Sequence, residues 1–135
     1  MHKSSTPIKM RCAEFSLIEE GVLHIRILEN SEIDIDESKL MQKQSLLMTE
    51  GKKFVALVDA RAEIIVSKES REWGSTPEAQ INMLAQAILV NSLANRIVGN
   101  FIIKFHKPSA KTALFKDEKS ALAWLREQKG ILEPK

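Results

Sequence analysis

Two short runs near the start of the chain alternate apolar and polar residues, as strands with one buried face do. The first run covers residues 13–18 and the second covers residues 22–28. Glu20 and Gly21 lie between them and form a short turn that contains glycine. Two alternating runs around such a turn predict an antiparallel β-hairpin.

Three more strands are expected further along the chain. Residues 54–58 form an uninterrupted apolar run that ends at Asp59, which is typical of a central strand covered on both faces. Alternation returns over residues 96–105, and residues 112–115 predict a short fifth strand. Helical segments separate the later strands, so parallel pairing through right-handed crossovers is expected.

The first two helices are predicted from their end signals. Asp36 is the expected N-cap of a helix that stops at Gly51. Ser67 is the expected cap of a short helix that runs through Trp73 to Gly74. The apolar stripe of the first helix is expected to consist of Leu40, Met41, Gln44, Leu47 and Met48.

Two further helices complete the expected order. Thr76, Pro77 and Glu78 combine a capping hydroxyl, a first-turn proline and an early acid, which is typical of a helix start. The uncharged residues 79–95 that follow predict a helix buried between layers or between subunits. Asp117 is expected to cap the last helix. The sequence thus predicts an α/β fold with a mixed sheet of about five strands and helices packed on it.

Length and composition indicate one domain. The chain has 135 residues, of which 44% are hydrophobic, enough for one core. We expect a flexible arm over residues 1–12, the domain over 13–130 and a tail over 131–135. The net charge of +2 argues against a dedicated nucleic-acid binder. Polar residues interrupt 79–95, which argues against a membrane span, and the absence of an export signal predicts a cytoplasmic protein.

The small net charge hides two oppositely charged segments. Residues 14–37 hold eight acids and one arginine, whereas residues 96–116 hold five basic residues and no acid. If each set reaches its own surface, the resulting dipole would steer a protein partner or order a homodimer; the alternative is scattered, solvated charge. The acidic residues from 29 to 37 lack the glycine turn and ligand spacing of a calcium loop, so a solvated loop is favoured.

Chemistry-bearing motifs are few. Cys12 with His24 or His106 is the one conceivable nucleophile pair, but nothing near Cys12 in the sequence activates its thiol. The five glycines are spread singly, and no phosphate-binding loop is present. His24 and Arg26 share the polar face of the second strand, where solvation is favoured over anion binding. We therefore predict no catalytic residues, no cofactor and no metal.

The order of elements resembles the STAS domain family, the SpoIIAA-like fold of anti-sigma-factor antagonists, and in particular small uncharacterised bacterial proteins of that fold. Two stretches carry the resemblance: Phe54–Asp59 with the turn and helix through Ser70, and the tail Leu114–Leu125. The topology agrees over residues 13–128. The resemblance implies a regulatory module that binds other proteins.

The serine that is phosphorylated in STAS domains has a counterpart position in this sequence. In that family a strand ending in Asp is followed by a turn in which a serine is phosphorylated at the start of a helix. Counting from Asp59 places the turn on Ser67, Lys68, Glu69 and Ser70, with Glu69 at the acceptor position. A carboxylate there is a permanent anion. A slip of one residue would place Ser70 there instead, and the simplest alternative is a capped helix start without further role.

Three hypotheses follow. The first is a non-catalytic interaction module without the usual serine switch, whose partner surface includes Asp59, Ser67, Lys68, Glu69 and Ser70. The second is a binder of a small apolar or lipid-like ligand, held in a pocket between the sheet and the helix expected over 79–95. The third is an enzyme acting through Cys12. A homodimer is expected under any of them, because the apolar 79–95 and 97–105 segments exceed what a thin fold buries.

Overall fold

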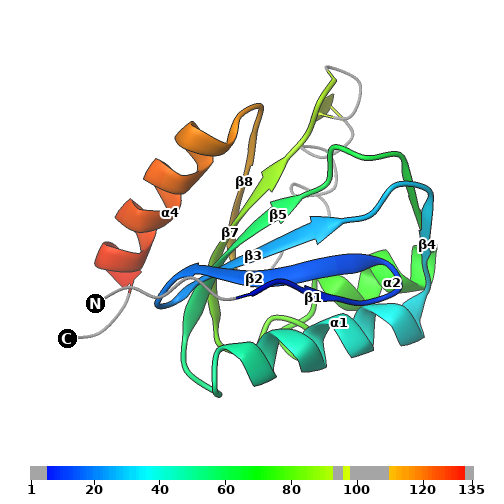
Figure 1. Ribbon diagram of the computed structural model, residues 1–135, viewed down its shortest axis with the longest axis horizontal. Helices are drawn as coiled ribbons and strands as arrows, with labels where there is room; N and C mark the ends of the chain where they lie inside the picture. The colour runs from blue at the N-terminus through cyan, green and yellow to red at the C-terminus, as the bar shows by residue number, and fades with distance from the viewer. Residues whose placement is uncertain (1–5, 93–95, 98–109, 133–135) are drawn as a thin grey trace.

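The computed structural model describes residues 6–92, 96–97 and 110–132. Its centre is a six-stranded mixed sheet in the order β1-β2-β3-β5-β7-β8 (Figure 1). The strands are β1 (Ile8–Lys9), β2 (Ala13–Glu19), β3 (Val22–Ile27), β5 (Phe54–Asp59), β7 (Met83–Leu89) and β8 (Lys111–Phe115). A separate two-stranded parallel ribbon pairs β4 (Ser31–Ile33) with β6 (Ile64–Val66).

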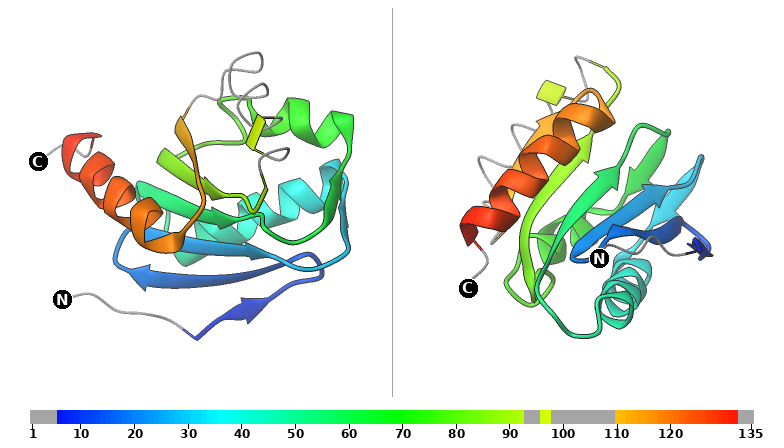
Figure 2. Two further views of the ribbon diagram at one scale, coloured as in Figure 1. Left: turned by 90° about the horizontal axis from the view of Figure 1, so that it is seen from above. Right: turned by 60° about the vertical axis from the view of Figure 1, so that its left-hand side comes forward.

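Helices cover both faces of the sheet. Helix α1 (Ile35–Met48) and helix α2 (Lys68–Gly74) lie on one side, and α4 (Glu118–Leu132) lies on the other (Figure 2). The core has two corresponding parts. Alternate residues of β2, β3 and β5 pack toward α1, whereas the residues between them in β3 and β5, with Ala85, Ala87 and Leu89, pack toward α4.

The predicted hairpin and central strand are confirmed. β2 and β3 pair antiparallel around Gly21, whose φ of 77° suits glycine. β5 lies between β3 and β7 in parallel pairing, and its residues 54–57 are buried. β8 and α4 also form as expected, and the Asp117 carboxylate accepts a 2.8 Å hydrogen bond from the Ser120 backbone N–H.

The prediction of a helix over residues 79–95 is wrong. Residues 83–89 form β7, a strand with parallel neighbours on both sides. Thr76 does accept a bond from the Ala79 N–H, but the chain continues as turns, and Asn82 reverses it with a φ of 67°. A short apolar run without charge fits a buried strand as well as a buried helix, so periodicity did not separate them. The apolar-ligand pocket against this helix therefore loses its structural basis.

Four smaller expectations also need correction. The arm over 1–12 is not wholly unpaired, because Ile8 and Lys9 pair with β2 and Cys12 is buried. The acidic loop contains β4, and the α1 N-cap is Asp34, whose carboxylate accepts from the Glu37 N–H. The expected tail begins inside α4, which reaches Leu132.

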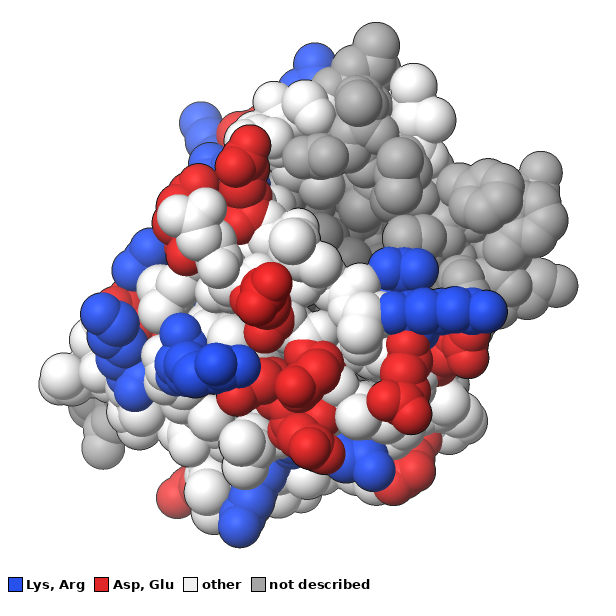
Figure 3. All heavy atoms as spheres, turned by 90° about the vertical axis from the view of Figure 1, so that its right-hand side faces the viewer, with Lys and Arg blue, Asp and Glu red and all other residues white. Residues whose placement is uncertain are grey.

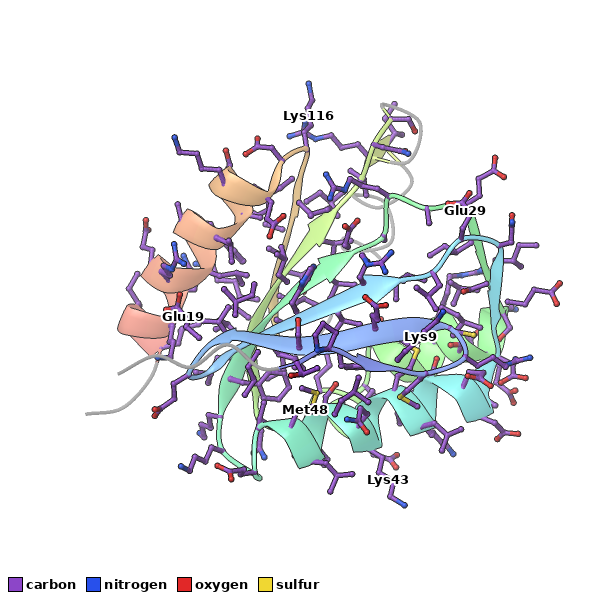
Figure 4. The ribbon with its side chains drawn as sticks, viewed as in Figure 1. Lys9, Glu19, Glu29, Lys43, Met48 and Lys116 are labelled. Carbon is purple, nitrogen blue, oxygen red and sulfur yellow. The ribbon has the colours of Figure 1, made fainter. Side chains whose placement is uncertain are left out.

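The inward face of α1 differs from the predicted stripe. Leu40 and Leu47 are 49% and 65% exposed, whereas Met41, Ser45 and Met48 are turned toward the sheet. Figure 4 shows Met48 between α1 and the sheet and Lys43 pointing away from it. The predicted strand over 96–105 lies mostly outside the described residues, and its first two residues, Arg96 and Ile97, are helical.

Candidate functional site

Helix α2 is fixed at its first turn by serine hydroxyls. Ser67 is the N-cap, and its Oγ accepts a 3.0 Å hydrogen bond from the Ser70 N–H. The Ser70 side chain is turned inward and its hydroxyl is hydrogen-bonded to the Ser38 hydroxyl of α1. Ser70 is only 3% exposed. The start of α2 is therefore held against α1, and its inward face is closed to solvent.

Lys68 and Glu69 lie on the opposite, solvent side of the same turn. Both residues are exposed. Lys68 Nζ is 3.8 Å from a carboxylate oxygen of Glu72, one turn on, in a pair whose members are both solvated. Glu69 stands in the first turn, where the helix dipole favours an anion. The first turn of α2 thus presents a cation and an adjacent anion on a fixed backbone.

Asp59 ends β5 and binds its own loop. Its carboxylate accepts two bonds from the Arg61 guanidinium, at 3.0 and 2.8 Å, and one from the Arg61 backbone N–H at 3.1 Å. Burial by itself raises the pKa of Asp59, but the hydrogen bonds from Arg61 and its positive charge outweigh burial, and the pKa of Asp59 is lowered. The Asn91 side-chain amide donates to the Arg61 carbonyl and ties this loop to the residues after β7.

The five residues singled out in the sequence therefore divide into two groups. Ser67, Lys68, Glu69 and Ser70 lie together at the start of α2. Asp59 lies before them, with β6 between, and among the described contacts none joins its carboxylate to α2. Lys68 and Glu69 are exposed, Ser67 is half-buried, and Ser70 and Asp59 are buried.

Cys12 and His24 lie on opposite faces of the sheet. Cys12 belongs to the core on the α1 side. His24 lies between Leu23 and Ile25 in β3, and because their side chains point to the α1 side, its own side chain points to the other face. Burial raises the pKa of the Cys12 thiol, whose Sγ contacts the Glu32 carbonyl at 3.7 Å. His106, the other candidate base, lies outside the described residues. The thiol has neither an adjacent imidazole from His24 nor a lowered pKa.

The acidic segment forms part of one surface. Figure 3 shows acidic side chains along the middle of the face that carries β4, with basic side chains to either side. Glu29 lies on the connection from β3 to β4 (Figure 4). Glu14, Glu19 and Glu37 form ion pairs with Arg26, Arg126 and Arg11. Within the part of the chain that is described, no three His, Cys, Asp or Glu side chains are grouped to hold a metal ion.

Sequence reasoning missed three features of this region. Arg61 follows Asp59 by two residues, a spacing that gave a weak signal for a local ion pair. Ser38 carries no signal at all, because its partner Ser70 is 32 residues away in the chain. The strand β6 had a readable signal in the β-branched run Ile64, Ile65 and Val66.

Comparison with solved structures identifies the class of fold. The chain resembles the crystal structure of an uncharacterised protein of the DUF3478 family from Shewanella loihica PV-4, which has a SpoIIAA-like fold. The match has a TM-score of 0.55 and covers 93% of this chain and 95% of the other, at 13% sequence identity. The protein is therefore of the SpoIIAA-like class, as its sequence predicted.

The particular family follows from the sequence. The family model named "Domain of unknown function (DUF7793)" matches residues 16–129, and the chain belongs to that family. None of the curated proteins matches the chain. Among the described helices, none is long and apolar enough to cross a membrane.

Proposed function

We propose that this protein is a non-catalytic interaction module of STAS type, which docks a protein partner on the outer side of α2. Lys68 and Glu69 contact the partner, and Ser67 and Ser70 position the surface. Asp59, which is bound to its own loop by Arg61, orders the segment that precedes β6. One observation carries the proposal. Lys68 and Glu69 are both exposed at a helix start whose opposite face is hydrogen-bonded to α1 through Ser70. A fixed backbone favours docking, because little conformational entropy is lost when the partner binds.

We further propose that docking needs no serine phosphorylation. Glu69 carries a negative charge at the position where the family resemblance puts the acceptor serine. Ser70, the neighbouring alternative, is buried and hydrogen-bonded to Ser38, so a phosphate there would have to displace α1. Treatment of the native protein with phosphatase should leave partner capture unchanged, and loss of capture would contradict this part of the proposal.

We also propose that Cys12 and His24 do not form a catalytic pair. The thiol of Cys12 is buried, and His24 faces the other side of the sheet. Nucleophilic catalysis needs a base within hydrogen-bond reach of the nucleophile. The homodimer and the cytoplasmic location stay predictions of the sequence; sedimentation velocity at high concentration tests the first.

A charge swap tests the docking surface. The double variant Lys68→Glu/Glu69→Lys keeps the net charge and inverts the local field at the start of α2. The matched control is Glu118→Lys/Lys119→Glu, which makes the same exchange at the exposed start of α4. Partners are captured from the native cell by the wild type and by both variants, and quantified by mass spectrometry.

We expect the wild type and the α4 variant to capture similar amounts of a specific partner. The amount captured by the α2 variant should be at least tenfold lower. Equal capture by all three proteins would remove α2 as the partner surface. Equal thermal unfolding of the two variants is the control that separates lost docking from lost folding.

A further inference from the structure

The strand β6 is paired along one edge, and no described strand lies along the other. Among the described residues it pairs with β4 alone, in the register Ser31–Ile64, Glu32–Ile65 and Ile33–Val66. The Glu63 carbonyl accepts from Asn30 and the Ser67 N–H donates to Ile33, so residues 63, 65 and 67 direct their backbone groups toward β4. In a parallel pair the alternate residues face the other way. Ile64 and Val66 therefore direct their N–H and C=O groups away from β4.

One of these outward groups is already occupied by a side chain. The Arg71 guanidinium donates a 2.7 Å hydrogen bond to the Val66 carbonyl. No described strand pairs with the remaining outward groups, the Ile64 N–H and C=O and the Val66 N–H. The exposed Arg71 side chain thus substitutes for one bond of a missing strand.

Two of the devices that usually block an open edge, lysine and proline in the strand itself, are absent from β6. Natural edge strands carry lysine or proline to prevent pairing with other chains. Residues 63–66 contain neither, and the central side chain, Ile65, is 66% exposed. Glu63, two residues earlier and exposed, precedes Ile65 by one strand repeat. The edge therefore offers backbone hydrogen bonds, one apolar side chain and a carboxylate beside it.

The charge around the ribbon defines the occupant. Glu32 lies opposite Ile65 on β4 and is exposed, and residues 29–37 hold five acids without a lysine or arginine. Figure 3 shows this acidic band on the face that carries β4. A second copy of the chain would bring a second acidic ribbon to the edge, which like-charge repulsion opposes. A basic segment is instead attracted by Glu32 and Glu63, and on binding it has to displace the Arg71 guanidinium from the Val66 carbonyl.

We propose that the β6 edge receives an extended, basic segment of a protein partner as an added strand. An apolar residue of that segment packs on Ile65, and flanking lysine or arginine side chains pair with Glu63 and Glu32. This inference rests on the proposed function, because it names the partner chemistry for the surface that α2 borders. Main-chain bonds supply affinity in this mode, and alternate side chains supply selectivity.

The probe is a short synthetic peptide in which lysine and valine alternate around a central valine. Its controls are a peptide with glutamate in place of each lysine and a lysine peptide whose valines are replaced by proline. Amide exchange and chemical shifts are followed by NMR on the full chain. We expect the lysine peptide to slow exchange of the Ile64 and Val66 amides at least tenfold, and both control peptides to leave them unchanged.

Variants separate the backbone bond from side-chain effects. Val66→Pro removes an outward donor and also the packing of the half-buried Val66 side chain on the core, so its thermal unfolding is compared with that of the wild type. Val66→Thr keeps the donor and the shape. We expect at least tenfold weaker peptide binding for the proline variant and less than threefold for the threonine variant. Ile65→Lys, at an exposed position that folding does not depend on, should also weaken binding at least tenfold.

Unchanged Ile64 and Val66 amides at saturating lysine peptide would overturn the inference. So would equal binding of the lysine and glutamate peptides, or a dimer in sedimentation that Ile65→Lys dissolves, since that result would assign the edge to a second copy. The charge swap at Lys68 and Glu69 tests the proposed function independently of the β6 edge. Partner capture that depends on α2 but not on Val66→Pro or Ile65→Lys would leave docking intact and remove strand addition.

Discussion

The hydroxyl of Ser70 on α2 is hydrogen-bonded to the hydroxyl of Ser38 on α1, which comes 32 residues earlier in the chain. The same residue donates its backbone N–H to the Ser67 cap. One buried serine therefore joins the helix start to its own cap and to the neighbouring helix. This contact sets the orientation in which Lys68 and Glu69 face solvent.

The serine contacts predict a graded series of stabilities. Ser67→Ala removes the N-cap and should lower the free energy of unfolding by about 1 kcal/mol. Ser70→Asp should cost more, because it places a carboxylate at a site that is 3% exposed. Glu69→Gln, at an exposed position, should stay within about 0.5 kcal/mol of the wild type. Urea unfolding measures all three, and a wild-type midpoint for Ser70→Asp would show that the Ser70 site is not enclosed.

The Asp59–Arg61 pair predicts a specific response to acid. The pKa of Asp59 is lowered in the folded protein, so its ion pair stabilises the fold above the carboxyl's unfolded pKa of about 4. That contribution is lost as the pH falls below this value, through the folded pKa. Arg61→Gln should remove about 1–2 kcal/mol at pH 7, reduced from a buried pair's value because the Arg61 side chain is 40% exposed.

The readout is the free energy of unfolding of the wild type and Arg61→Gln between pH 7 and pH 2. The difference between the two proteins should shrink below about pH 4, where Asp59 is first protonated in the unfolded chain and then, at lower pH, in the folded protein. A difference that stays constant over the whole range would mean that the guanidinium acts through packing and not through the Asp59 charge.

The small residues of β7 predict a strict size limit under α4. Ala87 is fully buried between Leu57 and Ala113 of the adjacent strands, on the side that α4 covers. Ala87→Leu should lower the free energy of unfolding by about 1–3 kcal/mol through overpacking. The control is Ala123→Leu on the exposed side of α4, which should change it by less than about 0.5 kcal/mol. Equal effects at the two positions would contradict the burial of Ala87 beneath α4.

The environment of Cys12 predicts a slow thiol. Cys12 is 2% exposed, and burial raises the pKa of its thiol above that of an exposed cysteine. Alkylation by iodoacetamide at pH 7.5 should therefore be at least 100-fold slower in the folded chain than in urea, since the thiolate is the reacting form. Mass spectrometry over time measures the rate. Labelling of the native chain as fast as the unfolded one would reopen the nucleophile hypothesis.

Local sequence was sufficient where one periodicity or one end signal allowed only one structure. The hairpin of β2 and β3 follows from two alternating runs around Gly21. Ser67 and Asp117 could be predicted as N-caps because each side-chain oxygen accepts a hydrogen bond from a backbone N–H only three residues away. The starts of α2 and α4 depend on contacts within one helical turn, and the residues that make such contacts are close together in the sequence.

Local sequence failed where two structures share a pattern. Residues 83–89 are apolar enough for a buried helix and for a central strand, and the neighbouring β5 and β8 decided for the strand by pairing with its backbone. The capping signal at Thr76 was real, since its hydroxyl accepts from Ala79, but no helix follows it. Leu40 and Leu47 were expected inside together with Met41 and Met48, but only the two methionines pack against the sheet, and the two leucines are exposed.

By itself, the sequence determined the class of fold, the central position of residues 54–59 and the capped start of α2, because each depends on hydrophobic pattern or on bonds between near neighbours. The tertiary structure decided which side chains at that start are buried and which are exposed. It set Ser38 against Ser70 and left the outer edge of β6 without a described partner strand. Contacts between segments far apart in the chain fix these features, and no local pattern encodes such contacts.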